Sequence, residues 1–381
     1  MVLKTSQKAG SFLLALVMLL SLTSVFCFKS ASAATDGEWK YELENGGVTI
    51  TGFIGTSRTI SVPSKVNGQR VKKVTALNNN NTKASVTTVS FANGIEEIGT
   101  GVCKGYISLE RVALPDTLVT IGSDAFFNCS SLTGITIPNS VTTIGTNAFN
   151  GCIALISADL SCKATVIPDG LFTGCKSLTT AALPSYTTDI GVAAFSGCSS
   201  LASINIPDTV KTIAKDAFNG CASLKRISLS TELKTIGEMA FKDCTGLTEI
   251  FIPNKVKTIS EEAFSGCTSL QNAYIGSSVS VIKKYIFSGC TALKNIVFGG
   301  DYYNFTDLSS TAVTGTYTYY PSKYADGWSH YDVVNMKSYS APTSVAISGT
   351  TEAAPGAKVT LKVTATVSYT HLRAHETGAY L

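Results

Sequence analysis

The stretch LTGITIPNSVTTIGTNAFNGC, residues 132–152, contains the pattern that decides the fold of this chain. Its closing cysteine recurs every 23 residues over seven intervals without a slip. The members of this series are Cys129, Cys152, Cys175, Cys198, Cys221, Cys244, Cys267 and Cys290. A sustained period of 20 to 50 residues is typical of solenoids and propellers, so the spacing reflects a structural repeat rather than a set of cross-links.

Three further apolar positions keep step with the cysteines. Phenylalanine stands three residues before each cysteine, at Phe126, Phe149, Phe172, Phe195, Phe218, Phe241, Phe264 and Phe287. Leucine stands three residues after it, at Leu132, Leu155, Leu178, Leu201, Leu224, Leu247, Leu270 and Leu293. Isoleucine recurs at Ile121, Ile144, Ile167, Ile190, Ile213, Ile236, Ile259 and Ile282. Because one short unit cannot bury such an apolar side alone, we expect the units to stack.

The pattern within a unit predicts a mainly β rung. Residues 132–137 alternate apolar and polar side chains as a short strand does, and Pro138 ends that strand. Residues 141–144 predict a second extended stretch, Gly145 allows a bend, and residues 147–152 predict one helical or 3₁₀ turn. Weaker copies extend back to Val86, which gives about ten rungs and a length of roughly 45 Å. The predicted fold is therefore a repeat solenoid, mainly β with short helical or 3₁₀ turns, capped at both ends.

The periodic cysteines point inward in this scheme. Their favoured interpretation is a column of buried, mostly reduced thiols that pack as small hydrophobic groups. An occasional disulfide between adjacent rungs stays geometrically possible. A column of metal sites is disfavoured because no histidine or carboxylate recurs beside the cysteines. Cys162 is out of register and is predicted to be a turn residue.

The sequence outside the repeat predicts distinct terminal segments. The first residues combine a basic head, a short apolar run and an Ala31-Ser32-Ala33 exit, as a secretory signal peptide does. The predicted segments are 1–33 signal peptide, 34–85 hairpin-like N-terminal cap and loop, 86–300 solenoid, 301–341 Tyr-rich C-terminal cap, 342–367 start of a truncated immunoglobulin-like module, and 368–381 a foreign-looking tail.

The net charge of the mature chain and the predicted export signal limit the classes of binding partner. Removal of residues 1–33 takes away three lysines and no acidic residue, so the formal charge falls from +4 to +1. A nearly neutral mature chain gives no electrostatic case for nucleic acid. No later segment is long and apolar enough to cross a membrane. We therefore expect a secreted or cell-surface protein.

The columns I-P-x-x-V-x-x-I-G-x-x-A-F-x-x-C-x-x-L, read at residues 137–155 and again at 206–224, resemble those of BspA-like bacterial leucine-rich-repeat surface proteins. The head W-K-Y-E-L-E-N-G-G-V-T-I-T-G-F at residues 39–53 is similar to that family as well. The resemblance implies a leucine-rich-repeat fold, a cell-surface or secreted location and an adhesin-like role. It does not imply a ligand, because binding depends on the exposed residues.

Catalytic chemistry is poorly represented in the sequence. The three histidines are His330, His371 and His375, and the last two fall in the foreign-looking tail. No phosphate-binding glycine loop, nucleophile elbow or calcium-loop spacing occurs, and no acid–base pair can be nominated. We therefore expect no enzyme activity, no cofactor and no metal.

One outward-facing position of the repeat changes character along the array. It reads Ala113, Thr136, Asp159, Ala182, Asn205, Ser228, Phe251, Tyr274 and Val297, so six small or polar residues give way to three large apolar ones. We call Phe251, Tyr274 and Val297 the apolar stripe. Polar and charged neighbours accompany it, among them Arg226, Glu249 and Asn272. An aromatic stripe with such neighbours is typical of a protein-binding hot spot. The alternative is that the Tyr-rich cap folds back and covers it.

Two functional hypotheses follow. The first is a binding module, an adhesin or surface-interaction protein for a protein on a host or bacterial surface, with no nucleic-acid partner. The second is a targeting or spacer part of a larger extracellular enzyme whose catalytic domain lies beyond this chain. A catalytic domain in a longer gene product would favour the second hypothesis.

Overall fold

The computed structural model describes residues 34–299, except for residues 45 and 78–82, together with the backbone of five short strands farther along the chain. These five are β24 (Asn304–Phe305), β25 (Thr316–Tyr319), β26 (Met336–Ser338), β27 (Ile347–Ser348) and β28 (Lys362–Val363). The predicted signal peptide, the foreign-looking tail and most of residues 301–367 lie outside the described residues.

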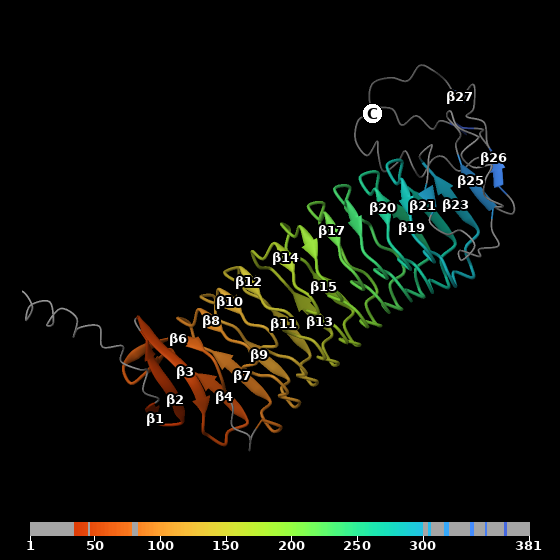
Figure 1. The fold of residues 1–381 in the computed structure, drawn as a ribbon. Helices are drawn as coiled ribbons and strands as arrows, with labels where there is room; N and C mark the ends of the chain where they lie inside the picture. Colours follow the sequence, from red (N-terminus) through yellow and green to blue (C-terminus); the bar gives the residue numbers. More distant parts are fainter. Residues whose placement is uncertain are drawn as a thin grey trace, which may run out of the picture.

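The described part is a β-solenoid of about eleven turns with a rung of about 23 residues (Figure 1). The predicted solenoid is therefore confirmed. Most full rungs pass through a longer strand and then a two-residue strand, and equivalent strands of successive rungs lie side by side; the two rungs that contain β17 (Thr212–Ile213) and β18 (Thr235–Ile236) lack the longer strand. Strands of adjacent rungs pair in parallel at a spacing of 23 residues, as in Gly134↔Ser157 and Thr120↔Thr143. This pairing provides hydrogen-bond partners for the backbone amides and carbonyls of neighbouring rungs.

The longer strands come from the L-x-x-I-x-I part of the repeat. They are β4 (Thr59–Val62), β7 (Thr88–Phe91), β9 (Arg111–Ala113), β11 (Gly134–Thr136), β13 (Ser157–Asp159), β15 (Thr180–Ala182), β19 (Glu249–Ile252), β21 (Asn272–Ile275) and β23 (Asn295–Phe298). They form three separate sheets, β4-β7-β9, β11-β13-β15 and β19-β21-β23-β25-β26. We call their outer side the long-strand face.

The two-residue strands come from the T-I position of the repeat. They are β8 (Glu97–Ile98), β10 (Thr120–Ile121), β12 (Thr143–Ile144), β14 (Val166–Ile167), β16 (Asp189–Ile190), β17 (Thr212–Ile213), β18 (Thr235–Ile236), β20 (Thr258–Ile259) and β22 (Val281–Ile282). Their outer side is the short-strand face. Their sheet is interrupted between β12 and β14, where the rung holds the out-of-register Cys162. That cysteine is buried in a bend, with 6% of its surface exposed.

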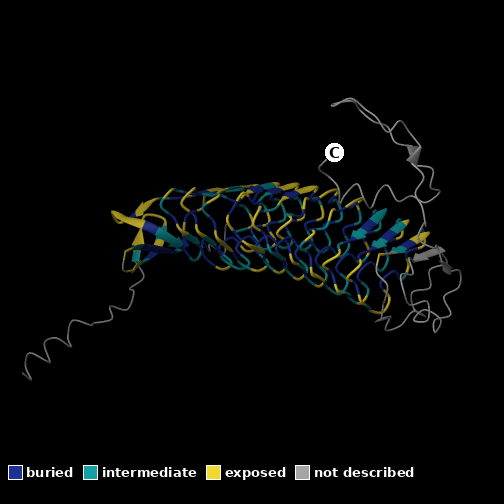
Figure 2. Cartoon of the chain, turned by 90° about the horizontal axis from the view of Figure 1, so that it is seen from above, coloured by how far each residue is buried: buried dark blue, intermediate teal, exposed yellow. Residues whose placement is uncertain are grey.

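The interior is one continuous apolar core that runs the length of the coil (Figure 2). The periodic phenylalanines are buried and stack from rung to rung, with ring centroids 5.2–5.8 Å apart between Phe126 and Phe287. The leucine and isoleucine columns are buried beside them. Stacking therefore supplies the burial that no single rung achieves alone.

The periodic cysteines are buried and unpaired, which agrees with the prediction of buried thiols. From Cys152 to Cys290, each Sγ donates a hydrogen bond to the backbone carbonyl of the phenylalanine 26 residues earlier, over 3.1–3.3 Å. The column therefore adds weak inter-rung hydrogen bonds to its packing.

The prediction of a helical or 3₁₀ turn before each cysteine is wrong, since the described residues contain no helix. In this segment alternate amides point in different directions. The amide of Phe127 donates locally to the carbonyl of Asp124, whereas the amide of Phe126 donates to Ala148 of the next rung. Asp124 and Asn128 adopt positive φ values of 55° and 57°, and equivalent residues do so in most rungs. These left-handed residues prevent helical continuation and direct every second amide to the neighbouring rung.

Gly145 was predicted to permit a bend, but its φ is not positive. Its role is instead to let its backbone lie close to the backbone of the preceding rung. A Cβ at this position would lie 2.2 Å from the backbone nitrogen of Ser123 in the preceding rung. At Gly134, in the same rung, the nearest atom to an added Cβ is 3.7 Å away. The bend that follows the two-residue strand therefore leaves no room for a side chain at residue 145.

This contrast gives a prediction for stability. We expect Gly145→Ala to lower the free energy of unfolding by about 1–3 kcal/mol, because two packed backbones must separate. Gly134→Ala in the same rung is the control and should change it by less than about 0.5 kcal/mol. Urea denaturation followed by circular dichroism measures both variants. Equal stabilities for the two would show that the rungs adjust freely at residue 145.

The N-terminal residues form the predicted hairpins. β2 (Trp39–Glu44) pairs antiparallel with β3 (Gly47–Phe53), and β1 (Ala34–Asp36) pairs with β2. β5 (Lys65–Val66) and β6 (Gln69–Val74) flank a two-residue turn, Asn67-Gly68, in which both φ values are positive. Such a turn matches the twist of a hairpin. β6 then pairs in parallel with β3 and β8, so this segment is continuous with the array.

Candidate binding surface

The apolar stripe lies on adjacent rungs of the long-strand face, as predicted. Phe251 of β19, Tyr274 of β21 and Val297 of β23 occupy the same register position. The rings of Phe251 and Tyr274 stack in parallel, with centroids 4.3 Å apart and planes inclined by 2°. All three side chains are half-buried rather than fully exposed. Parallel strand pairing thus places side chains that are 23 residues apart in the sequence next to one another on the sheet.

The polar neighbours of the stripe form contacts along the same strands. Arg226 Nε lies 3.3 Å from Glu249 Oε1, and the Arg226 side chain is 79% exposed. Asn295 Nδ2 donates to Asn272 Oδ1 over 2.8 Å. Partial burial, and secondarily the Glu249 carboxylate, raise the pKa of Tyr274. The tyrosine therefore stays a neutral hydroxyl that can donate a hydrogen bond at the edge of the stripe.

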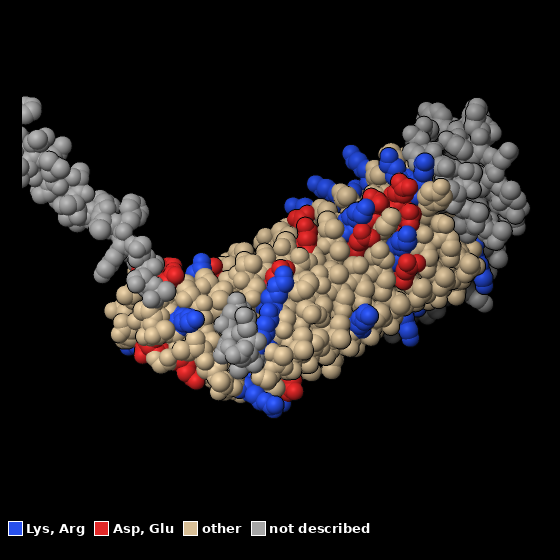
Figure 3. Space-filling view, turned by 60° about the horizontal axis from the view of Figure 1, so that its bottom comes forward, with Lys and Arg blue, Asp and Glu red and all other residues tan. Residues whose placement is uncertain are grey.

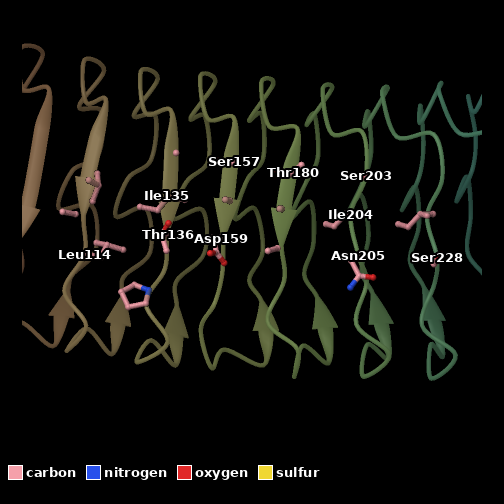
Figure 4. Close-up of a pocket in the computed structure, with 18 of the residues that line it drawn as sticks. Leu114, Ile135, Thr136, Ser157, Asp159, Thr180, Ser203, Ile204, Asn205 and Ser228 are labelled. Carbon is pink, nitrogen blue, oxygen red and sulfur yellow. The ribbon is translucent and has the colours of Figure 1, made fainter.

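The six small or polar residues before the stripe line a groove that was not predicted from the sequence. It has a volume of about 1030 Å³ and crosses the rungs of β9, β11, β13 and β15 and the next two (Figure 4). Its lining includes Ala113, Thr136, Asp159, Ala182, Asn205 and Ser228, with Ser157, Thr180, Ser203 and Arg226 beside them. The run of small residues in the sequence was the signal from which the groove could have been predicted. It indicates a groove because short side chains leave the strand face lower than the stripe that follows.

The floor of the groove contains two rungs without strand pairing. Among the described residues, the backbone amides and carbonyls of Ser203–Ile206 and Arg226–Leu229 form no hydrogen bond. The long-strand sheet is consequently interrupted between β15 and β19. Backbone polar groups at a surface need water or a ligand as partner. The groove therefore offers main-chain donors and acceptors as well as hydroxyl, amide and carboxylate side chains.

The prediction that the Tyr-rich segment covers the apolar stripe falls mainly outside the described residues. Three strands of that segment are described: β24 pairs in parallel with β22 on the short-strand sheet, whereas β25 and β26 extend the long-strand sheet at its edge, where β25 pairs in parallel with β23 and β26 pairs with β25. In the pairing of β23 with β25, Val297 is opposite Thr318. β25 and β26 lie beside the stripe in the plane of the sheet. Whether the stripe is covered stays a prediction.

The distribution of charge differs along the array. On the face shown in Figure 3, Lys, Arg, Asp and Glu side chains gather toward the C-terminal rungs, whereas the middle carries few charges. Over the described residues, no group of three or more potential metal ligands occurs. Within the same residues, no helix is suited to spanning a membrane.

The sequence matches the profile of the BspA-type leucine-rich-repeat region in six copies, over residues 79–202 and 188–314. This match spans more than half of the chain. The chain belongs to the BspA-type leucine-rich-repeat family. The family resemblance inferred from the repeat columns is therefore confirmed. A search of curated proteins found no match.

Several solved structures of bacterial proteins align with this chain. A leucine-rich cell surface protein from Faecalibacterium prausnitzii A2-165 is 25% identical, with a TM-score of 0.44, and the alignment covers 79% of this chain and 97% of that one. The leucine-rich-repeat protein of T. pallidum is 28% identical, with a TM-score of 0.43 and coverages of 57% and 91%. The pneumococcal vaccine antigen PcpA is 17% identical, with a TM-score of 0.42 and coverages of 81% and 97%. Membership of this BspA-type family rests on the repeat match and not on these alignments.

Proposed function

We propose that this BspA-type protein is a non-catalytic binding module of the bacterial surface that holds an extended segment of a protein ligand on its long-strand face. The observation that carries the proposal is the junction of the groove with the apolar stripe. A polar, shallow floor meets a stacked pair of aromatic rings, and the charged Arg226 lies at the boundary. Aromatic and arginine side chains are enriched at the centres of protein interfaces.

The dimensions of the groove favour an extended polypeptide. Six rungs span five intervals of about 4.8 Å, or roughly 24 Å, which is the length of about seven extended residues. Ser157, Thr180 and Asn205 provide hydrogen-bonding groups for a peptide backbone. The apolar stripe provides the contact area for one or two large ligand side chains. Such a ligand would be a protein on a host or bacterial surface, which makes the chain an adhesin or a related interaction protein.

The leucine-rich-repeat family is a non-catalytic fold class. Its role in this chain, under the proposal, is to present a long rigid surface outside the cell. Secretion through the predicted signal peptide at residues 1–33 and attachment at the cell surface form part of the same proposal. They are tested by fractionating cells that express the full gene and locating the protein.

Peptide binding provides the test of the groove. A phage library that displays random 12-residue peptides is selected on the full chain, and the affinities of the selected peptides are measured. We expect Thr136→Arg combined with Thr180→Arg to weaken binding more than ten-fold, because two long side chains fill the groove. We expect Phe251→Ala combined with Tyr274→Ala to cost about 2 kcal/mol, roughly thirty-fold.

Two arginines on the short-strand face are the matched control. Thr143→Arg combined with Thr146→Arg adds the same charge at exposed positions and should leave the affinity within about two-fold. If the groove-filling and control variants bind the selected peptides equally, the groove is not the site. If no peptide is selected at all, the proposal of an extended polypeptide ligand is wrong.

A further inference from the structure

Three lysines occupy one position of the repeat on three adjacent rungs. Lys211, Lys234 and Lys257 each precede a two-residue strand, and the strands β17, β18 and β20 pair in register at Thr212↔Thr235↔Thr258. All three lysines are exposed. We call them the lysine row. Neighbouring strands lie about 4.8 Å apart, so the row presents positive charges at a short, regular spacing along the array axis.

The row departs from the way in which the rest of the array arranges charge. Elsewhere, adjacent rungs place opposite charges together, as in Lys215–Glu238, Arg226–Glu249 and Lys255–Glu232, each pair 23 residues apart. Within the described part of the chain, Lys211, Lys234 and Lys257 form no ion pair within 4 Å. No other repeat position there stacks three like charges. Like charges on adjacent strands oppose folding, so packing within the chain does not account for the row.

The acidic groups near the row do not neutralise it. Glu232 precedes Lys234 by two residues, but its carboxylate binds Lys255. That hydrogen bond, followed by the charges of Lys255, Lys234 and Lys211, lowers the pKa of Glu232. Asp208 stands in the corresponding turn of the preceding rung and is exposed. Asp189 of β16 is paired in register with Thr212 at the end of the row. Four lysines against three acids leave an excess of positive charge at this corner.

Two further groups extend the surface. The hydroxyls of Thr212, Thr235 and Thr258 follow the lysines on the same three rungs. Tyr186 stands in the turn one rung before Lys211, and 70% of its surface is exposed. The surface therefore combines regular positive charge, a row of hydroxyls and one aromatic ring at its end.

We propose that the lysine row, with Tyr186, binds a linear anionic polysaccharide that runs along the array axis. A lysine ammonium acts as a point charge without a planar fork, which suits sulfate or carboxylate groups spaced along a polymer more than one bidentate ligand. Threonine hydroxyls pair with sugar hydroxyls, and an aromatic ring can pack against the C–H face of a sugar. Single-stranded nucleic acid is disfavoured because its binding sites place aromatic rings beside successive bases.

This site is separate from the proposed peptide groove. It lies on the short-strand sheet, whereas the groove lies across the long-strand sheets. The two proposals therefore fail independently. Variants in the groove leave the lysine row unchanged, and variants in the row leave the groove unchanged.

Binding of the full chain to fluorescent dextran sulfate tests the proposal. We expect affinity to fall steeply with salt, because polyanions release counterions when lysines replace them. Lys211→Gln combined with Lys234→Gln and Lys257→Gln should weaken binding by roughly ten-fold or more at low salt, and should reduce the slope of log affinity against log salt by about 2. Tyr186→Ala should weaken binding several-fold without changing that slope.

The matched control removes the same charge from lysines that already have partners. Lys104→Gln combined with Lys215→Gln and Lys242→Gln should bind dextran sulfate within about two-fold of the unaltered chain. Equal losses in the two triple variants would mean that only net charge matters and would overturn the site. The proposal is also overturned if dextran sulfate does not bind, if uncharged dextran binds as well, or if oligothymidylate binds more tightly.

Discussion

Raising the pH above about 9 is expected to unfold the array. Burial raises the pKa of eight thiols, and the value reaches about 12 for Cys152, Cys198 and Cys244; the other five are Cys103, Cys129, Cys162, Cys175 and Cys221. In the unfolded chain a thiol ionises near pH 8.5. Between these two pKa values the unfolded chain binds fewer protons than the folded one. The free energy of unfolding therefore falls as the pH rises, and is unaffected by these groups below the unfolded pKa.

The expected effect is large because the thiols act together. One ionising group changes stability by about 1.4 kcal/mol per pH unit, so the three thiols with a pKa of about 12 alone give a slope of about 4 kcal/mol per pH unit, and the other buried thiols act in the same direction. Domains have a total stability of roughly 5–15 kcal/mol. We therefore expect cooperative loss of β structure within one to two pH units of pH 9, measured by circular dichroism.

Thiol reactivity separates this cause from general alkaline damage. At pH 8 the ten cysteines of the described residues should resist a thiol reagent in the folded chain and should react after unfolding in urea. Cys175→Ala combined with Cys198→Ala should make the stability less steeply dependent on pH, whatever its effect at pH 7. An unchanged stability between pH 8 and pH 11 would contradict the buried-thiol picture, as would finding nearly all cysteines paired under non-reducing conditions.

Phe218→Ala is expected to cost about 5 kcal/mol of unfolding free energy. The ring is fully buried and stacks on Phe195 and Phe241, with centroid distances of 5.3 Å on both sides. Deleting a buried phenylalanine costs about 3–5 kcal/mol, and each lost aromatic contact adds roughly 0.5–1.5 kcal/mol. In a solenoid each rung contacts only its neighbours, so protection from hydrogen exchange should be lost first around rungs 195–241.

Phe127→Ala is the control for the stacked column. Phe127 is adjacent to Phe126 in sequence but half-buried, and Lys104 Nζ lies 4.7 Å from its ring centroid. Its truncation should cost no more than about 1 kcal/mol. Denaturation in urea measures both changes. Comparable losses at residues 127 and 218 would refute the view that the stacked column holds the rungs together.

The position of the apolar stripe follows from the repeat period alone. The period places Phe251, Tyr274 and Val297 at one position of the unit, and parallel stacking then requires them to be neighbours. That requirement is why the stripe could be predicted. Its partial burial could not, because exposure depends on the side chains and strands that lie around it.

The groove was not predicted because its depth is a property of several rungs together. The small residues from Ala113 to Ser228 are visible in the sequence, but small residues also pack inside tight turns. Only the backbone shows that the sheet is interrupted at Ser203–Ile206 and Arg226–Leu229. Strand pairing between rungs depends on distances and angles that residue type does not encode.

The turns before each cysteine show which features the local sequence determines and which depend on the stacking of rungs. The sequence by itself determined the 23-residue rung, the inward columns of Phe, Cys, Leu and Ile, and the hairpin-like character of the N-terminal segment, because apolar periodicity and turn residues have local physical causes. Only the tertiary structure decided that the turns are not helical. Met239 and Glu262 adopt positive φ values there, which their side chains disfavour. The hydrogen bonds to the adjacent rung hold them in that conformation, and such bonds exist only when the rungs are stacked.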